Sequence, residues 1–366
     1  MRSSKLARAA FFLALGCATG SSKSRADEDL PAVHTLPCTS ICANSSRAIG
    51  ISQPIPPWPQ QFLDASDTYI EGYVRLHYKI NTDGHVSDIS VVSVVGPEAF
   101  AKKAISTVKD WTYKPAMLDG KPVETCHTLN VTFKMPTNKS DMRPGARPAI
   151  VSTYRAAIED IQNNKLDEAL VILKEALSQP KLNLYERGML ANVTSAIALQ
   201  RGDYLEAHRA SSVALEIAGS DLPKVVSRML LETRLKSALF LGDLVDALDT
   251  QDRLKEIKDY DLSNPIFAAL DQVRSKADSM PIFSVQAKIP EISQGENTYF
   301  GLYRRSFAFT EIKGSLSGFT LNCRQQSIES KISETVEWHV PKSWSDCRVL
   351  VRGAPGTTFK LAQLTD

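Results

Sequence analysis

Residues 69–95 read YIEGYVRLHYKINTDGHVSDISVVSVV, and this stretch decides the fold of the segment around it. Apolar and polar side chains alternate from Tyr69 to Ile80, a pattern that is typical of a half-buried β-strand. The pair Asp83-Gly84 follows, and an Asp-Gly pair between two alternating runs indicates a hairpin turn. We therefore predict an antiparallel hairpin whose return strand spans residues 86–95.

The chain on the C-terminal side of this hairpin predicts one helix and further strands. Gly96-Pro97 ends the return strand, and a proline fits the first turn of a helix. Apolar side chains then recur at helical spacing over residues 98–110, which predicts an amphipathic helix. Residues 111–115 read as extended chain, Asp119-Gly120 predicts a second turn, and alternation over residues 125–135 predicts a last strand.

Four short motifs lie in and around this segment. They are, in chain order, Trp58-Pro59, Glu71-Gly72-Tyr73-Val74, Asp83-Gly84-His85-Val86 and Trp111-Thr112-Tyr113-Lys114-Pro115. In this order and spacing the segment resembles the C-terminal domain of TonB, the periplasmic energy transducer of Gram-negative bacteria. That family usually shows Tyr-Pro, EGxV, DGxV and WxYxP at these places. The resemblance covers residues 50–137 of the 366.

The resemblance implies a small α+β domain that captures an extended peptide of an outer-membrane receptor, the TonB box, by adding it as a strand. Such capture needs an edge strand, and the last strand is the candidate. The residues we assign to this edge are His127, Leu129, Val131 and Phe133. The family-motif residues are Trp58, Pro59, Gly72, Gly84, Trp111, Tyr113 and Pro115. For Trp111 and Tyr113 the alternative is a core role, and for Gly84 a positive φ in a turn.

Composition and motifs argue against several function classes. The chain is 43% hydrophobic and 23% charged with a net charge of +2, as in ordinary globular proteins, and it shows no basic stripe with interleaved aromatic residues that would predict nucleic-acid binding. No G-x-S-x-G, H-E-x-x-H or Gly-rich phosphate loop occurs. Cys126 and His127 are neighbours on a strand and point to opposite faces, so they cannot form a dyad. We predict no enzyme, no cofactor and no metal site.

The N-terminus predicts export. Basic residues precede a short apolar run over residues 9–16, too short for a membrane-spanning helix of about 20 residues. We assign residues 1–18 as a signal peptide and residues 19–49 as a linker. Leu13-Ala14-Leu15-Gly16-Cys17 also resembles a lipobox, so Cys17 lipidation and simple cleavage both stay open.

The predicted location is therefore the periplasm of a Gram-negative envelope, with membrane attachment only through a lipid anchor. The transmembrane helix and the long Pro-rich spacer of the TonB energy transducers have no counterpart in the sequence. The resemblance therefore favours the peptide-binding half of the family's function, and coupling to an inner-membrane motor stays open.

Six cysteines in an oxidising compartment predict disulfides. Cys323 and Cys347 lie in one β-rich region and form the expected pair. Cys38 and Cys42 are close enough to form a local bridge, and Cys126 could replace one member of that pair. A metal or redox motif at Cys38–Cys42 is the alternative to such a structural loop, but the histidines are scattered along the chain.

Beyond a linker at residues 138–148, the sequence turns helical over residues 149–280 and repeats. Equivalent turns precede Ala169, Ala207 and Ala247, which lie 38 and 40 residues apart. This period resembles degenerate tetratricopeptide repeats, and the alternative is a plain helical bundle. Either arrangement would make the helices a scaffold for a protein partner.

Residues 281–366 are rich in short alternating runs with Gly and Pro between them, which predicts a small antiparallel sandwich or barrel. The whole chain therefore reads as a multidomain α+β protein. Two functions remain: a TonB-like protein that binds an extended peptide in TonB-dependent transport across the outer membrane, or an envelope scaffold that does not transduce energy and uses its helical repeats. The partner, the transported substrate and the oligomeric state cannot be read from the sequence.

Overall fold

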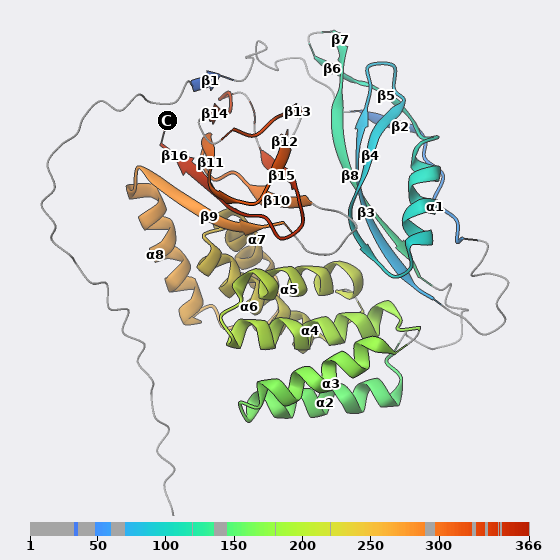
Figure 1. Ribbon diagram of the computed structural model, residues 1–366, viewed down its shortest axis with the longest axis vertical. Helices are drawn as coiled ribbons and strands as arrows, with labels where there is room; N and C mark the ends of the chain where they lie inside the picture. The colour runs from blue at the N-terminus through green and yellow to red at the C-terminus, as the bar shows by residue number, and fades with distance from the viewer. Residues whose placement is uncertain are drawn as a thin grey trace, which may run out of the picture.

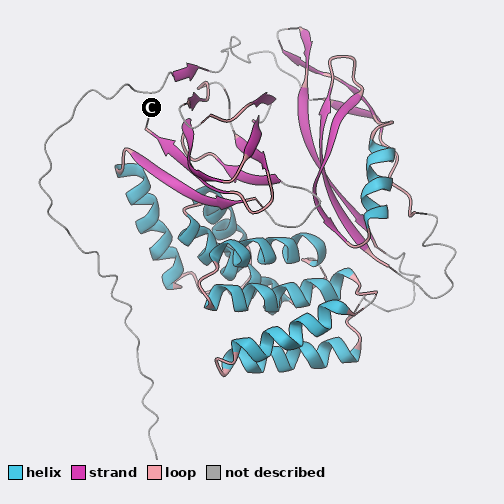
Figure 2. Cartoon of the chain, in the orientation of Figure 1, coloured by secondary structure: helices cyan, strands magenta, loops and turns pink. Residues whose placement is uncertain are grey.

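The computed structural model describes residues 33–35, 48–59, 70–118, 120–134, 145–179, 181–219, 221–289, 297–323, 327–333, 336–342, 344 and 346–365. Figure 1 shows three parts in contact: a sheet backed by one helix, an array of helices, and a β-sandwich formed largely by the C-terminal chain. Colouring by secondary structure separates the helical middle of the chain from the two β-rich parts (Figure 2). The molecule is therefore a mixed α+β protein.

The first part is an antiparallel three-stranded sheet of order β4-β3-β8. Its strands are β3 (Gly72–Ile80), β4 (Val86–Val95) and β8 (Thr125–Phe133), and α1 (Glu98–Val108) covers one face. The helix and the hairpin strands lie where the alternating and helical patterns predicted them. Two small ribbons flank the sheet: β2 (Ile49–Ser52) with β5 (Thr112–Lys114), and β6 (Ala116–Leu118) with β7 (Lys121–Val123).

The prediction that β3 is half-buried is wrong, because both of its faces are covered. Val74 and Leu76 pack toward α1 in the core of the sheet. On the opposite face Tyr73 is 1% exposed and His77 is 4% exposed. Tyr73 belongs to the apolar cluster of the helices, so the helices cover part of the face that alternation assigned to solvent, and Arg352 and Glu329 of the sandwich lie near His77.

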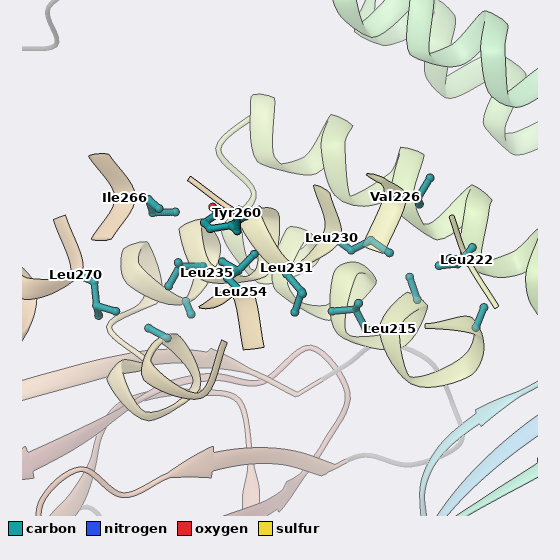
Figure 3. Close-up of a cluster of buried hydrophobic side chains, with 14 of the residues drawn as sticks. Leu215, Leu222, Val226, Leu230, Leu231, Leu235, Leu254, Tyr260, Ile266 and Leu270 are labelled. Carbon is teal, nitrogen blue, oxygen red and sulfur yellow. The ribbon is translucent and has the colours of Figure 1, made fainter. Parts of the chain in front are cut away.

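The second part is an array of helices that stack side by side (Figure 1). They are α2 (Pro148–Gln162), α3 (Leu166–Ser178), α4 (Leu184–Gln200), α5 (Tyr204–Ala218), α6 (Lys224–Leu241), α7 (Leu244–Lys255) and α8 (Pro265–Ser279). Figure 3 shows leucines and other apolar side chains of α5–α8 meeting in one cluster, which no single helix pair could bury.

One turn occurs three times in this array, before α3, α5 and α7. Its central residue has positive φ, at Asn164, Gly202 and Gly242. The next residue donates its backbone N–H to the carbonyl five residues earlier at 2.8–2.9 Å, as in a Schellman motif. The alanine that follows in each copy is completely buried. The same turn therefore precedes each of the three alanines that the sequence pattern aligns.

The third part consists of two sheets packed as a sandwich. One has the order β1-β14-β11-β16-β9 and the other β10-β15-β12-β13. The strands are β1 (Val33–Thr35), β9 (Ile282–Lys288), β10 (Asn297–Gly301), β11 (Ser306–Lys313), β12 (Leu316–Asn322), β13 (Ser327–Ser330), β14 (Glu337–His339), β15 (Arg348–Gly353) and β16 (Thr358–Leu364). Phenylalanines from both sheets, including Phe309 and Phe319, fill the space between them.

Three features of the sandwich bear on the sequence predictions. The predicted disulfide between Cys323 and Cys347 is present, with an S–S distance of 2.01 Å. The sequence runs that predict strands in this region do not include residues 297–301 and 327–330, which form β10 and β13. The short strand β1 pairs in parallel with β14, although its residues were assigned to a linker.

In the described residues no helix is both long and apolar enough to cross a membrane.

Candidate functional site

The candidate site is the outer edge of β8. In the described residues β8 is the last strand of its sheet and pairs with β3 along its whole length, from Thr125 opposite Ile80 to Phe133 opposite Gly72. An edge strand presents backbone N–H and C=O groups that its sheet does not use. Thr128, Asn130 and Thr132 are exposed, so the second half of β8 is accessible on the face away from α1.

The four residues that we assigned to this edge share the other face. Val131 and Phe133 are buried in the core, and the Phe133 ring lies 4.6 Å from that of Phe100. Leu129 is half-buried against the same core. These side chains hold β8 on the sheet, so an added strand would bond to the backbone of β8. The side chains of Thr128, Asn130 and Thr132, on the face away from α1, would lie beside the added strand.

His127 sits at the other end of the strand within a group of rings. Its imidazole stacks on Tyr78 at a centroid distance of 5.9 Å and lies 6.1 Å from Tyr113. The Tyr78 and Tyr113 hydroxyls are 2.7 Å apart. Burial lowers the pKa of His127 and, with the hydrogen bond to Tyr113, raises the pKa of Tyr78. His127 and Tyr78 are therefore uncharged near neutral pH, and the three rings act as packing residues.

Two motif glycines allow close approaches that position the strands. Gly84 has φ +87°, and a Cβ there would lie 2.0 Å from the Tyr113 carbonyl oxygen. The Gly84 carbonyl accepts the Tyr113 N–H at 2.9 Å, so the hairpin turn is bonded to the strand after α1. A Cβ at Gly72 would lie 2.3 Å from the Phe100 ring, which shows how closely α1 packs on β3.

The remaining motif residues anchor the segment before β3. The Trp111 indole N–H donates to the Pro54 carbonyl at 3.0 Å, and Trp111 is buried. Trp58 packs edge-on against Phe100 at 5.9 Å. Pro59 is buried and Pro115 is half-buried. Trp111 and Tyr113 therefore lie in the core, which is the alternative that the sequence left open for them.

Sequence reasoning missed a set of contacts between the sheet and the helices, which we call the sheet–helix clasp. It joins Glu71, Tyr73, Arg75 and Lys134 on the sheet to Leu184, Glu216 and Asp221 on the helical side. Glu216 on α5 accepts the Tyr73 hydroxyl at 2.9 Å and Arg75 at 2.6 Å.

The other contacts of the clasp extend it to α4 and to the loop after α5. Glu71, the motif glutamate, accepts the Leu184 backbone N–H at the start of α4 at 2.8 Å, and Lys134 lies 2.5 Å from Asp221. A carboxylate at a helix N-terminus is favourable because it meets unpaired N–H groups and the helix dipole. These partners lie 87–143 residues apart in sequence, and no local pattern signals such a pairing.

A second polar cluster ties three helices together. Asp246 on α7 forms an ion pair with Arg234 on α6 and lies 3.0 Å from the His208 ring on α5. Burial alone would raise the pKa of Asp246, but Arg234 and His208 hold it well below its usual range. Within the described residues no group of three or more His, Cys, Asp or Glu side chains could hold a metal ion.

Several predicted residues cannot be placed. Cys17, Cys38 and Cys42 lie outside the described residues, so lipidation and the N-terminal bridge stay predictions. Cys126 is half-buried in β8, and its pairing with Cys38 or Cys42 stays a prediction as well.

The fold and the edge together define a class: a small antiparallel sheet, backed by one helix, with a terminal strand at which an extended chain can be added. Residues 62–135 match the family described as Gram-negative bacterial TonB protein C-terminal, so the resemblance is confirmed for this segment, which contains three of the four motifs. We call residues 62–135 the TonB-like segment.

Two solved structures of such domains are similar to this part of the chain. The TonB C-terminal domain of Pseudomonas aeruginosa is 24% identical, with a TM-score of 0.23, and the match covers 28% of this chain and 100% of that one. The TonB2 protein of Vibrio anguillarum is 29% identical, with a TM-score of 0.21, and the match covers 30% of this chain and 100% of that one. No curated protein matches the chain.

Proposed function

We propose that the protein captures an extended peptide at the outer edge of β8, within TonB-type transport across the Gram-negative envelope. The observation that carries this proposal is the place of β8 at the end of its sheet, with exposed polar side chains over its second half. The match of residues 62–135 to the TonB C-terminal family supports it. The proposed peptide-binding unit is residues 50–137, and the proposed location is the periplasm, either soluble or anchored at Cys17.

The stretch of β8 from Thr128 to Phe133 is the proposed binding edge. Affinity in strand addition comes mainly from main-chain hydrogen bonds, and side chains set specificity. The row Thr128, Asn130 and Thr132 is uncharged, so the best cross-strand neighbours on that face are uncharged polar or β-branched side chains. On the α1 face the neighbours are Leu129 and Val131, which favour apolar residues.

The test uses a synthetic peptide from the periplasm-facing N-terminal segment of an outer-membrane receptor, and measures its affinity by calorimetry. N-methylation of alternate residues in one register removes the N–H groups that would bond to β8, and we expect at least a tenfold loss of affinity. Methylation in the other register faces solvent and leaves affinity within about twofold, which makes it the matched control. Equal effects of both registers would refute strand addition.

A variant pair tests the same edge from the side of the protein. We expect Asn130→Ala to bind the peptide as the wild type does, because it keeps the backbone N–H. The N–H groups of Leu129 and Asn130 point to opposite sides of β8. Of the two variants Leu129→Pro and Asn130→Pro, one therefore loses the N–H that faces the peptide, and the other loses an N–H that bonds to β3. One of the two proline variants should therefore stay folded by circular dichroism and lose the peptide. Peptide binding by the proline variant that stays folded would contradict the proposal.

A second function, an envelope scaffold that binds a protein through tetratricopeptide-like repeats, is supported by a different observation. Large apolar side chains are exposed on the helices: Val171 on α3 is 66% exposed, and Phe240 on α6 is 66% exposed and stacks on Tyr204 at 4.0 Å. The stacked rings of Phe240 and Tyr204 are the proposed contact point of such a scaffold. This scaffold would need no energy transduction.

The two functions separate in a capture experiment from envelope extracts. Loss of outer-membrane receptors with the folded proline variant of β8, but not with Phe240→Ser, supports peptide capture. The reverse pattern supports the scaffold. Capture of the same proteins by both variants would contradict both proposals.

A further inference from the structure

The polar face of β3 is a docking surface within the chain. Along this face Tyr73 and Arg75 contact Glu216 of α5, and Lys79 pairs with Asp88 at 2.9 Å. Tyr73 also joins the apolar cluster of the helices. The surface therefore combines a buried aromatic ring with cations, and it fits a helix that presents a carboxylate.

His77 lies at the centre of this face and differs from its neighbours. It is 4% exposed, and neither of its ring nitrogens has a hydrogen-bond partner among the described residues. Burying a polar group without a partner opposes folding, and native proteins show this rarely. Opposite it on the neighbouring strands are Ser90 and Thr128, neither of which carries a charge.

The charged groups around His77 disfavour a proton on it. Arg352 of β15 acts against the charged form of the ring, whereas Arg75 and Lys79, which flank His77 on its own strand, are paired with Glu216 and Asp88. Glu329 of β13 acts in the opposite direction, and Glu216 of α5 is already bonded to Arg75. His127 of β8 is also near, but its ring is stacked on Tyr78 on the α1 face.

We propose that the polar face of the β4-β3-β8 sheet is an acid-releasable docking surface for the helices and the sandwich, closed at neutral pH by the sheet–helix clasp and opened when His77 takes up a proton. The occupant is the chain's own helices together with the sandwich that is fixed to them, and the clasp holds it through Glu216, Asp221 and the N–H of Leu184. Release would expose Glu216 and the cationic row of β3 at the same time.

The direction of the pH effect follows from linkage. Burial, followed by Arg352, lowers the pKa of His77 from 6.5 to about 4 in the docked state. Above pH 6.5 His77 is neutral in both states and docking is at full strength. Between pH 6.5 and about 4 only the released state takes up the proton, so docking weakens by up to about tenfold per pH unit. Below that window the effect levels off.

The experiment measures the distance between two labels on the full chain, one at Lys102 on α1 and one at Lys236 on α6, from pH 8 to pH 3.5. Both side chains are exposed, and unnatural amino acids carry the fluorophores so that the cysteines stay intact. A second pair, Glu168 with Lys236, lies within the helices and reports their unfolding. We expect the first pair to separate between pH 6.5 and 4 while the second pair stays constant.

Three variants decide the cause. In His77→Leu the first pair should stay together through this window. His85→Leu, at an exposed histidine of the same segment, should follow the wild type and is the matched control. Glu216→Gln should weaken docking at every pH. Identical pH profiles for wild type and His77→Leu, or no separation in the wild type, would overturn the proposal.

Discussion

At the scale of single residues, Gly84 explains why the third motif, Asp83-Gly84-His85-Val86, contains a glycine. Its φ of +87° suits the turn, and the Tyr113 carbonyl lies where a side chain would begin. Gly120 also has a positive φ, +75°, but has no atom within 4 Å of an added Cβ. A comparison of substitutions at these two glycines therefore separates the cost of backbone strain from the cost of a steric clash.

We predict that Gly84→Ala lowers the free energy of unfolding by about 2–4 kcal/mol, because backbone strain and a clash with Tyr113 add. Gly120→Ala has the strain alone and should cost only about 1 kcal/mol. Urea unfolding of both variants checks this. Equal losses would contradict the assignment of a close contact to Gly84.

Glu186 is a second residue whose environment makes a sharp prediction. Its buried carboxylate accepts bonds from Arg147 at 2.8 and 3.0 Å and completes the capping box of α4 with Asn183. Burial alone would raise the pKa of Glu186, but these bonds hold it below 4.5. Its contribution to stability is therefore present above the unfolded-state pKa and is lost as pH falls through the lowered folded-state value.

We expect Glu186→Gln to lower the free energy of unfolding by about 2–3 kcal/mol at pH 7, because charge-assisted hydrogen bonds to a buried group are lost. The difference from wild type should shrink as pH falls below 4.5. The exposed Glu175 provides the control, since Glu175→Gln should change stability by less than about 0.5 kcal/mol at either pH. A difference that does not change with pH would contradict the role of the ionised carboxylate.

At the scale of elements, the sequence patterns predicted the strands, helix and turn that depend on residues close together in the chain. The strand pattern of residues 72–80, the helical stripe of 98–108 and the turn at Gly84 all appear in the structure. The burial of both faces of β3 could not be predicted, because Glu216, which contacts its polar face, and Arg352, whose charge acts on His77, are remote in sequence. The exposed edge of β8 was predicted, but the side chains assigned to it point to the core, since the pairing with β3 sets which face they share.

At the scale of the whole molecule, the sandwich and the helices hold the TonB-like segment in place. Arg304 donates to the carbonyls of Ala277 and Met280 at the end of α8, and Arg348 pairs with Asp249 on α7 at 3.2 Å. The sandwich is therefore fixed to the helices, as the clasp fixes the sheet. The sequence predicted the sheet, the helices and the β-rich region separately. No pattern in it indicated that these parts contact one another.

Reduction of the Cys323–Cys347 disulfide tests how independent the sandwich is. It closes a loop with a sequence separation of 24, so its loss should cost the sandwich about 3 kcal/mol. Hydrogen exchange should show faster opening of β12 and β15 than of β3 in Cys323→Ala/Cys347→Ala. Uniform loss of protection across the chain would instead mean that the parts unfold as one unit.

The most direct test of peptide capture is amide hydrogen exchange of the full chain, measured by NMR with and without the receptor peptide. Strand addition predicts slower exchange at alternate amides between Thr128 and Phe133, with β4 and the helices unchanged. Peptide binding that slows exchange on β4 or on α5 and α6, and leaves every amide of β8 as it was, would contradict the account.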